Sequence, residues 1–301
     1  MTATEPSLSE GRSLTPGAGR RAAPAIGAWL PTWPLINTRL LELRKRRTLM
    51  IVTVAFTVGL PVIFYAIRLL YHLGDPARYA PAGAPDAFAT IGILMGEFGF
   101  IVAATVGATA GTADLTDGVF RHLVITGRSR LALYLARIPA GLSILLSLAA
   151  AGFTVTCLVT AFLGSPHAAA GVTVSAGDMV RSGLWLELDL LIGFVLGLGL
   201  GSLMGQRTVP VILLIALEII ITPALAGRAL PYFLDGERLV VGVAMDQLKP
   251  AALAGGQQVG PGGGVGLQVP PMPTWAMITV IAGWIIGWSA IGAWKMVTRD
   301  A

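Results

Sequence analysis

The segment GTADLTDGVFRHLVITGRSR, residues 111–130, is a charged interruption between two long apolar runs. Thr116 or Asp117 can cap the N-terminus of a short helix within it, and Gly127 is a typical residue at a helix C-terminus. Ser129 can then cap the apolar helix that follows. We therefore expect a short helix between two apolar helices, in a position where a partner protein can bind and move it.

One face of this short helix is predicted to be apolar. Val119, Phe120, Leu123 and Val124 recur at helical spacing, and Arg121 lies beside them. A face of this kind needs a cover, either a lipid surface or the groove of a partner. An ordinary polar connector between two helices is the alternative interpretation of the same segment.

The composition of the whole chain indicates a membrane protein. Only 12% of its 301 residues are charged and its mean hydropathy is +0.75, whereas about a quarter of the residues of a soluble domain are charged. Several apolar runs approach 20 residues, which is the length of a transmembrane helix. These runs are continuous and do not alternate, so we expect an all-α polytopic membrane protein and not a β-barrel.

The chain is expected to divide into a tail and one membrane domain. Residues 1–32 are rich in Pro, Gly, Ala, Ser and Thr and predict a disordered cytoplasmic tail. Residues 33–301 form the transmembrane domain, which begins with an amphipathic helix over residues 33–47 at the membrane surface. The six predicted spans are residues 49–71, 88–110, 131–162, 183–204, 209–225 and 275–297. We expect Pro61 to kink the first span.

The basic residues predict the orientation of these spans. With the N-terminus inside, fifteen of the 21 Lys and Arg residues fall on the inner side and six on the outer side. The positive-inside rule therefore predicts that both termini are cytoplasmic. The outer loop, residues 226–274, is the longest; its first half is apolar enough to dip into the membrane, and residues 255–273 are rich in Gly and Pro.

The sequence contains no signature of an enzyme. No G-x-x-x-x-G-K-[ST] motif is present, so the chain is not expected to hold a nucleotide by a phosphate-binding loop. Four carboxylates lie within the apolar runs: Glu97, Glu187, Asp189 and Glu218. Glu97 and Glu218 are the candidates for a translocation path or a proton relay, because the other two lie closer to a predicted span end. A structural hydrogen bond is the alternative for each.

Glycines at positions 193, 197 and 201 form a ridge of small residues, and this pattern favours close helix packing over ligand binding.

Four short motifs, in this order along the chain, resemble permease subunits of type-2 ATP-binding-cassette exporters. They are ELRKRR at 42–47, GT at 111–112 followed by Leu123 and SR at 129–130, GLGLGS at 197–202, and the closing stretch 294–301. This family includes bacterial drug, antibiotic and polysaccharide export permeases. The chain departs from the pattern where the family often has a proline near Gly127 and a lysine near Arg137.

The resemblance implies a permease in the bacterial cytoplasmic membrane. A second permease subunit, identical or different, would complete the translocation path. A separate cytoplasmic ATPase would bind ATP and Mg²⁺, so no cofactor or metal is expected on this chain. The resemblance places the contact with the ATPase at Asp117, Val119, Phe120, Arg121, Leu123 and Val124.

Two other functions fit the same sequence. A proton-coupled secondary transporter could use the intramembrane carboxylates, although its usual inverted repeats and broken helices are not evident. A non-transporting membrane anchor or regulatory subunit is the third possibility.

Overall fold

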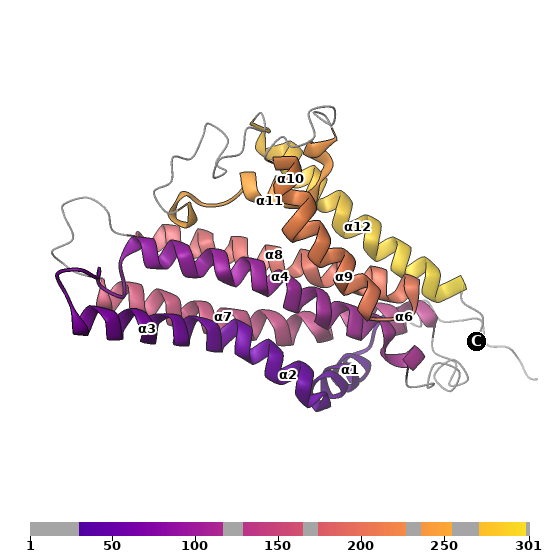
Figure 1. The fold of residues 1–301 in the computed structure, drawn as a ribbon. Coiled ribbons are helices and arrows are strands. Elements are labelled where there is room, and N and C mark those ends of the chain that lie inside the picture. The colour runs from indigo at the N-terminus through magenta and orange to yellow at the C-terminus, as the bar shows by residue number, and fades with distance from the viewer. Residues whose placement is uncertain (1–29, 117–128, 165–173, 227–235, 255–270, 299–301) are drawn as a thin grey trace, which may run out of the picture.

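The computed structural model describes residues 30–116, 129–164, 174–226, 236–254 and 271–298, and within these ranges the chain is helical and contains no strand (Figure 1). The α-helices are α1 (Trp33–Lys45), α2 (Arg47–Val54), α3 (Leu60–Gly74), α4 (Pro85–Thr116), α6 (Arg130–Leu135), α7 (Arg137–Leu163), α8 (Ala176–Met204), α9 (Thr208–Ala216), α10 (Thr222–Ala226), α11 (Val241–Gln247) and α12 (Thr274–Thr298). Two π-helical turns, η2 (Ala55–Gly59) and η3 (Leu217–Ile221), and two 3₁₀ turns, η4 (Glu237–Leu239) and η5 (Ala251–Leu253), complete the elements.

Five helical segments are long and apolar enough to cross a membrane. They are Arg47–Gly74, Pro85–Asp114, Arg130–Leu163, Ala176–Met204 and Thr274–Thr298. Large apolar side chains are exposed along several of them, for example Ile63 on α3 and Ile286 on α12. The described structure is therefore that of an all-helical chain compatible with a multi-pass membrane protein.

Helices α4 and α8 form the centre of the fold and lie side by side along much of their length (Figure 1). Their backbones touch because small residues face each other. A Cβ atom on Gly197 would overlap the backbone of Ala104, and one on Gly201 would lie 2.8 Å from the carbonyl oxygen of Ala108. The predicted glycine ridge is thus confirmed as a packing surface.

Each π-helical turn ends two residues before a proline. Residues 55–59 come before Pro61, and residues 217–221 come before Pro223. Proline has no N–H group and its ring crowds the preceding turn, so a wider turn accommodates it without breaking the helix. At Pro61, where the sequence predicts a kink, the structure has this π-helical turn, which ends one residue before the helix resumes as α3.

The helix in the position of the fifth predicted span is shorter than the others. Its apolar part, Thr208–Ala224, has fewer than 18 residues. At 1.5 Å per residue it extends roughly 25 Å, somewhat less than the ~30 Å hydrocarbon core of a bilayer. It packs against both α4 and α8.

The segment after α10 folds back against the helices. Residues 241–245 are buried, and α11 contacts α12. Two tryptophans fix the segment: Trp185 Nε1 donates to the carbonyl oxygen of Met245 (2.9 Å), and Trp284 Nε1 donates to that of Leu239 (2.7 Å). Residues 241–245 are thus covered by the protein itself, whereas Leu239 remains exposed.

Two helix boundaries differ from those predicted. Helix α4 continues to Thr116, so residues 111–116 extend the preceding helix and do not belong to a separate connector. Helix α8 begins at Ala176, seven residues before the predicted span, because Ser175 caps it by accepting a hydrogen bond from Asp178 N (3.1 Å). Both extensions move polar residues deeper into the bundle than the sequence suggested.

Candidate functional site

A buried ion network joins three helices next to the charged segment. Asp114, near the end of α4, accepts from both terminal nitrogens of Arg39 on α1, at 2.5 and 2.7 Å. It also accepts from Arg137 Nη2 at the start of α7 (2.5 Å), and Arg137 Nη1 donates to the carbonyl oxygen of Gly111 (2.9 Å). The side chains of Asp114 and Arg137 are only 3% and 2% exposed. We refer to Arg39, Asp114 and Arg137 as the ion network.

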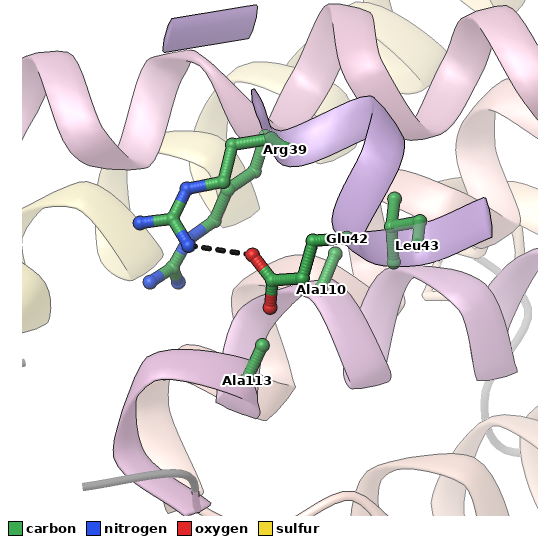
Figure 2. A pocket seen from close by; sticks show the side chains of 6 residues that line it. Arg39, Glu42, Leu43, Ala110 and Ala113 are labelled. Atoms are coloured by element: carbon green, nitrogen blue, oxygen red, sulfur yellow. Dashed lines mark hydrogen bonds and ion pairs between the residues drawn. The ribbon is translucent and has the colours of Figure 1, made fainter. Parts of the chain in front are cut away.

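The sequence of α1 explains why an arginine points inward. Leu35, Arg39 and Leu43 recur every four residues and form the buried face of the helix. The two leucines pack on the bundle and carry Arg39 with them. Glu42 accepts from Arg39 Nη1 at 2.8 Å and lies 3.6 Å from Arg46 (Figure 2). Burial disfavours the charge on Arg39, but Asp114 and Glu42 outweigh this effect and raise its pKa.

A small cavity lies beside the network. It is lined by Arg39, Glu42, Leu43, Ala110, Ala113 and Arg137 and has a volume of about 10 Å³, enough for about one water molecule (Figure 2). The Nε atoms of Arg39 and Arg137 are buried and have no hydrogen-bond partner within the described part of the chain. A water molecule here would supply the missing acceptor.

Residues of the ion network lie on both sides of residues 117–128 in the sequence. Asp114 precedes this segment on α4, and Arg137 follows it on α7, so α1 is fastened to both flanking helices. Ser129 caps α6 as predicted, because its side chain accepts from Ala132 N (3.1 Å). The residues predicted to contact a partner (Asp117, Val119, Phe120, Arg121, Leu123 and Val124) lie outside the described residues.

The structure brings the other two predicted residues, Glu97 and Glu218, near a third carboxylate. Glu97 is exposed on α4, Glu218 is half-buried in η3, and Asp189 on α8 is 6% exposed. The three lie within electrostatic range of one another and of Lys249, which follows α11. Lys249 itself pairs with Asp246 at 2.7 Å.

Sequence reasoning missed the importance of Asp189. The predicted span began at residue 183, which put Asp189 close to the membrane surface. Because α8 begins at Ala176, Asp189 lies about 20 Å along the helix.

The ion network was also missed, although one signal was present. Arg39 interrupts an apolar stripe that Leu35 and Leu43 define, and a charged residue inside such a stripe indicates a buried partner. No local pattern identified Asp114 as that partner.

No protein-family model matches the chain, and no curated protein matches it. Conclusions about function therefore depend on the two clusters of charged residues and on the arrangement of the helices around them.

Proposed function

We propose that this chain is the transmembrane permease subunit of an ATP-driven exporter of the type-2 ATP-binding-cassette class. A second permease subunit completes the translocation path, and a separate cytoplasmic ATPase drives the cycle. The short helix Thr208–Ala224 serves as a sixth span, both termini are cytoplasmic, and the membrane is the bacterial cytoplasmic membrane.

The ion network is the observation that carries this proposal. A coupling segment transmits force only if its two ends are held by rigid elements, because a loose loop would absorb the movement. Asp114 links α4 to α7 through Arg137 and to α1 through Arg39. A force applied to residues 117–128 would therefore move α1, α4 and α7 together. ATP, bound to the separate ATPase, would shift the population toward the conformation of the complex that binds ATP more tightly.

The position of Glu97 supports a second subunit. It lies about 18 Å along α4, near the middle of the span Pro85–Asp114, and it is exposed on the single chain. A carboxylate at this depth does not face lipid without a large cost. A water-filled path between two subunits would give it a polar environment.

The energy source gives one prediction. Purified alone in lipid, the chain is expected to release no phosphate from ATP, because it lacks a phosphate-binding loop. Together with its ATPase in sealed vesicles, it should transport while ATP is present, including after an uncoupler has removed the proton gradient. ATP turnover by the pure subunit would contradict the proposal.

A proton-coupled secondary transporter is the second candidate, and the grouping of Glu97, Asp189 and Glu218 favours it. Under the exporter proposal, Glu97→Gln and Glu218→Gln change substrate range or stability but do not make transport depend on a proton gradient. Loss of transport on uncoupling at constant ATP would place this candidate first.

Topology gives a further prediction. In a Cys157→Ser background, single cysteines at Ser13 and Arg299 should resist a membrane-impermeant thiol reagent in intact cells, because the charge distribution places both sites inside. A cysteine at Gly262 should react. Labelling of the Gly262 cysteine only after cell lysis would rule out the six-span arrangement.

A further inference from the structure

An open cavity of about 320 Å³ lies between the start of α2, the C-terminal part of α4 and the turn that joins α8 to α9. Ligand pockets in proteins have volumes of roughly 300–1,000 Å³, so this cavity can hold a small ligand or the headgroup of a lipid. Its charged lining residues are Arg46, Arg47 and Arg207, and none of the described residues that line it is acidic. We refer to it as the arginine cavity.

The fold brings the three arginines together from distant parts of the sequence. Arg46 and Arg47 lie where α1 ends and α2 begins, and Arg207 directly precedes α9. Gly205 allows a tight turn before Arg207: its φ is 71°, in the left-handed region, and its N–H donates to the carbonyl oxygen of Gly201 (2.9 Å). The position of Arg207 at the cavity is therefore set by the way α8 ends.

The positive charge of the arginine cavity is only partly balanced. Arg46 lies 3.6 Å from Glu42, a carboxylate that also accepts from Arg39. Arg47 and Arg207 are exposed, and neither forms an ion pair with any residue that the structure describes. Like charges that line one cavity repel each other, so an anion between them would lower the energy of this arrangement.

Orientation in the membrane explains a run of basic residues but not this cavity. The positive-inside effect depends on the number of Lys and Arg residues near the ends of spans, and it requires no particular arrangement of them. Arg44 and Lys45 belong to the same basic run and are exposed, but they are not among the residues that line the cavity. The convergence of Arg47 with Arg207 is a separate observation, and it points to an anionic ligand.

The other walls of the cavity indicate the kind of anion. On α4, Thr105 and Thr109 donate their hydroxyl protons to carbonyl oxygens of their own helix (2.8 and 2.7 Å), so they add polarity but no charge. On α2, Leu49 and Val52 line the cavity, and Val52 is exposed close to the exposed Ile51 on a segment apolar enough to cross a membrane. An apolar wall that leads onto the exposed surface of such a segment suits a ligand with acyl chains.

We propose that the arginine cavity binds a phosphate ester, and that the headgroup of an anionic phospholipid supplies it. Guanidinium groups bind phosphate oxygens through paired N–H donors, and basic pockets between transmembrane helices recognise lipid headgroups. Arg47 and Arg207 hold the phosphate oxygens, Arg46 adds positive charge, and the acyl chains lie along Leu49 and Val52. The bound lipid links the start of α2 to the turn between α8 and α9. The site does not rest on the exporter function proposed above.

Two lipids with the same acyl chains test the proposal. The purified subunit, without any ATPase, is kept in a mild detergent, and binding of phosphatidylglycerol and phosphatidylcholine is titrated by native mass spectrometry. Both lipids contain one phosphodiester, but only phosphatidylglycerol carries a net charge. The wild-type chain should bind phosphatidylglycerol at least about tenfold more tightly, because the choline ammonium group offsets the charge that the arginines recognise. Glycerophosphoglycerol, the same headgroup without acyl chains, should bind more weakly than the whole lipid.

Single variants locate the site. Arg47→Gln and Arg207→Gln should each weaken binding of phosphatidylglycerol about tenfold or more, since each removes hydrogen bonds between charged groups. Both residues are exposed, so both variants should fold. Arg207→Lys keeps the charge but not the paired donors, and its affinity should lie between those of the wild type and Arg207→Gln. Arg44→Gln is the matched control: it removes the same charge from the same basic run, outside the cavity, and should bind as the wild type does.

Equal affinity of the wild-type chain for the two lipids would overturn the site. It would also be overturned if Arg47→Gln and Arg207→Gln both bound phosphatidylglycerol as tightly as Arg44→Gln. Binding of glycerophosphoglycerol as tight as that of the whole lipid would retain the phosphate site but overturn the lipid as its source. None of these measurements involves the ATPase or transport, so failure of the exporter proposal is detected separately.

Discussion

Asp114→Asn is expected to lower the free energy of unfolding by about 3–5 kcal/mol, because it leaves two buried arginines without their shared counter-ion. Asp114 is 3% exposed and accepts from both Arg39 and Arg137. Asparagine keeps the size of the side chain but not its charge, and it replaces one of the two acceptor oxygens with a donor. The two guanidinium groups would then repel each other across the site.

Another aspartate on α4 provides the control. Asp86 pairs with Arg68 at 2.7 Å, but its side chain is 57% exposed. Exposed ion pairs contribute about 0–1 kcal/mol, so Asp86→Asn should change stability little. The measurement is the thermal denaturation midpoint of each variant in the same detergent, together with its yield in the membrane.

A double variant separates charge from packing. If unpaired positive charge causes the loss, adding Arg39→Met to Asp114→Asn should cost less than the sum of the two single changes. Equal stability of Asp114→Asn and Asp86→Asn would show that the ion network does not hold α1 against the bundle. The proposal of a rigid frame around residues 117–128 would then lose its support.

The sequence predicted the features that depend on local pattern. Continuous apolar runs indicated the helices, because a backbone in lipid must satisfy its own hydrogen bonds. Ser129 was predicted as a helix cap and Gly197 as a packing contact, and both were confirmed. Glu97 and Glu218 stood out because carboxylates are rare in apolar runs, and the structure places both near Asp189.

Features that depend on residues far apart in the sequence could not be predicted in the same way. Arg39 and Asp114 are 75 residues apart, and Asp114 and Arg137 are separated by 23. A single sequence contains no signal that pairs them: the apolar stripe of α1 indicates that Arg39 has a buried partner, but not that Asp114 is this partner. The proximity of Lys249 to Asp189 could not be predicted for the same reason, because it depends on how residues 236–254 fold back against α8.

The largest functional effect is expected from the segment that the ion network frames. Val119, Phe120, Leu123 and Val124 share one face of a helix about two turns long by their spacing. A short apolar face docks in a partner groove through a few anchors, with neighbouring charges setting the register. An aromatic anchor in a desolvated pocket contributes about 2 kcal/mol or more, which corresponds to at least roughly thirtyfold in affinity.

Phe120→Ala is therefore expected to weaken association with the ATPase by this amount and to reduce transport in proportion. Arg121→Glu should act similarly, because it reverses a charge beside the apolar face. Insertion into the membrane should be normal for both variants, since neither residue lies in a predicted span. The experiment is co-purification with the ATPase, normalised to the subunit present in the membrane, with Asp86→Asn as a variant remote in sequence from residues 117–128. If Phe120→Ala and Arg121→Glu both co-purify and transport like the wild type, residues 117–128 are a plain connector, and the ion network serves only the stability of the fold.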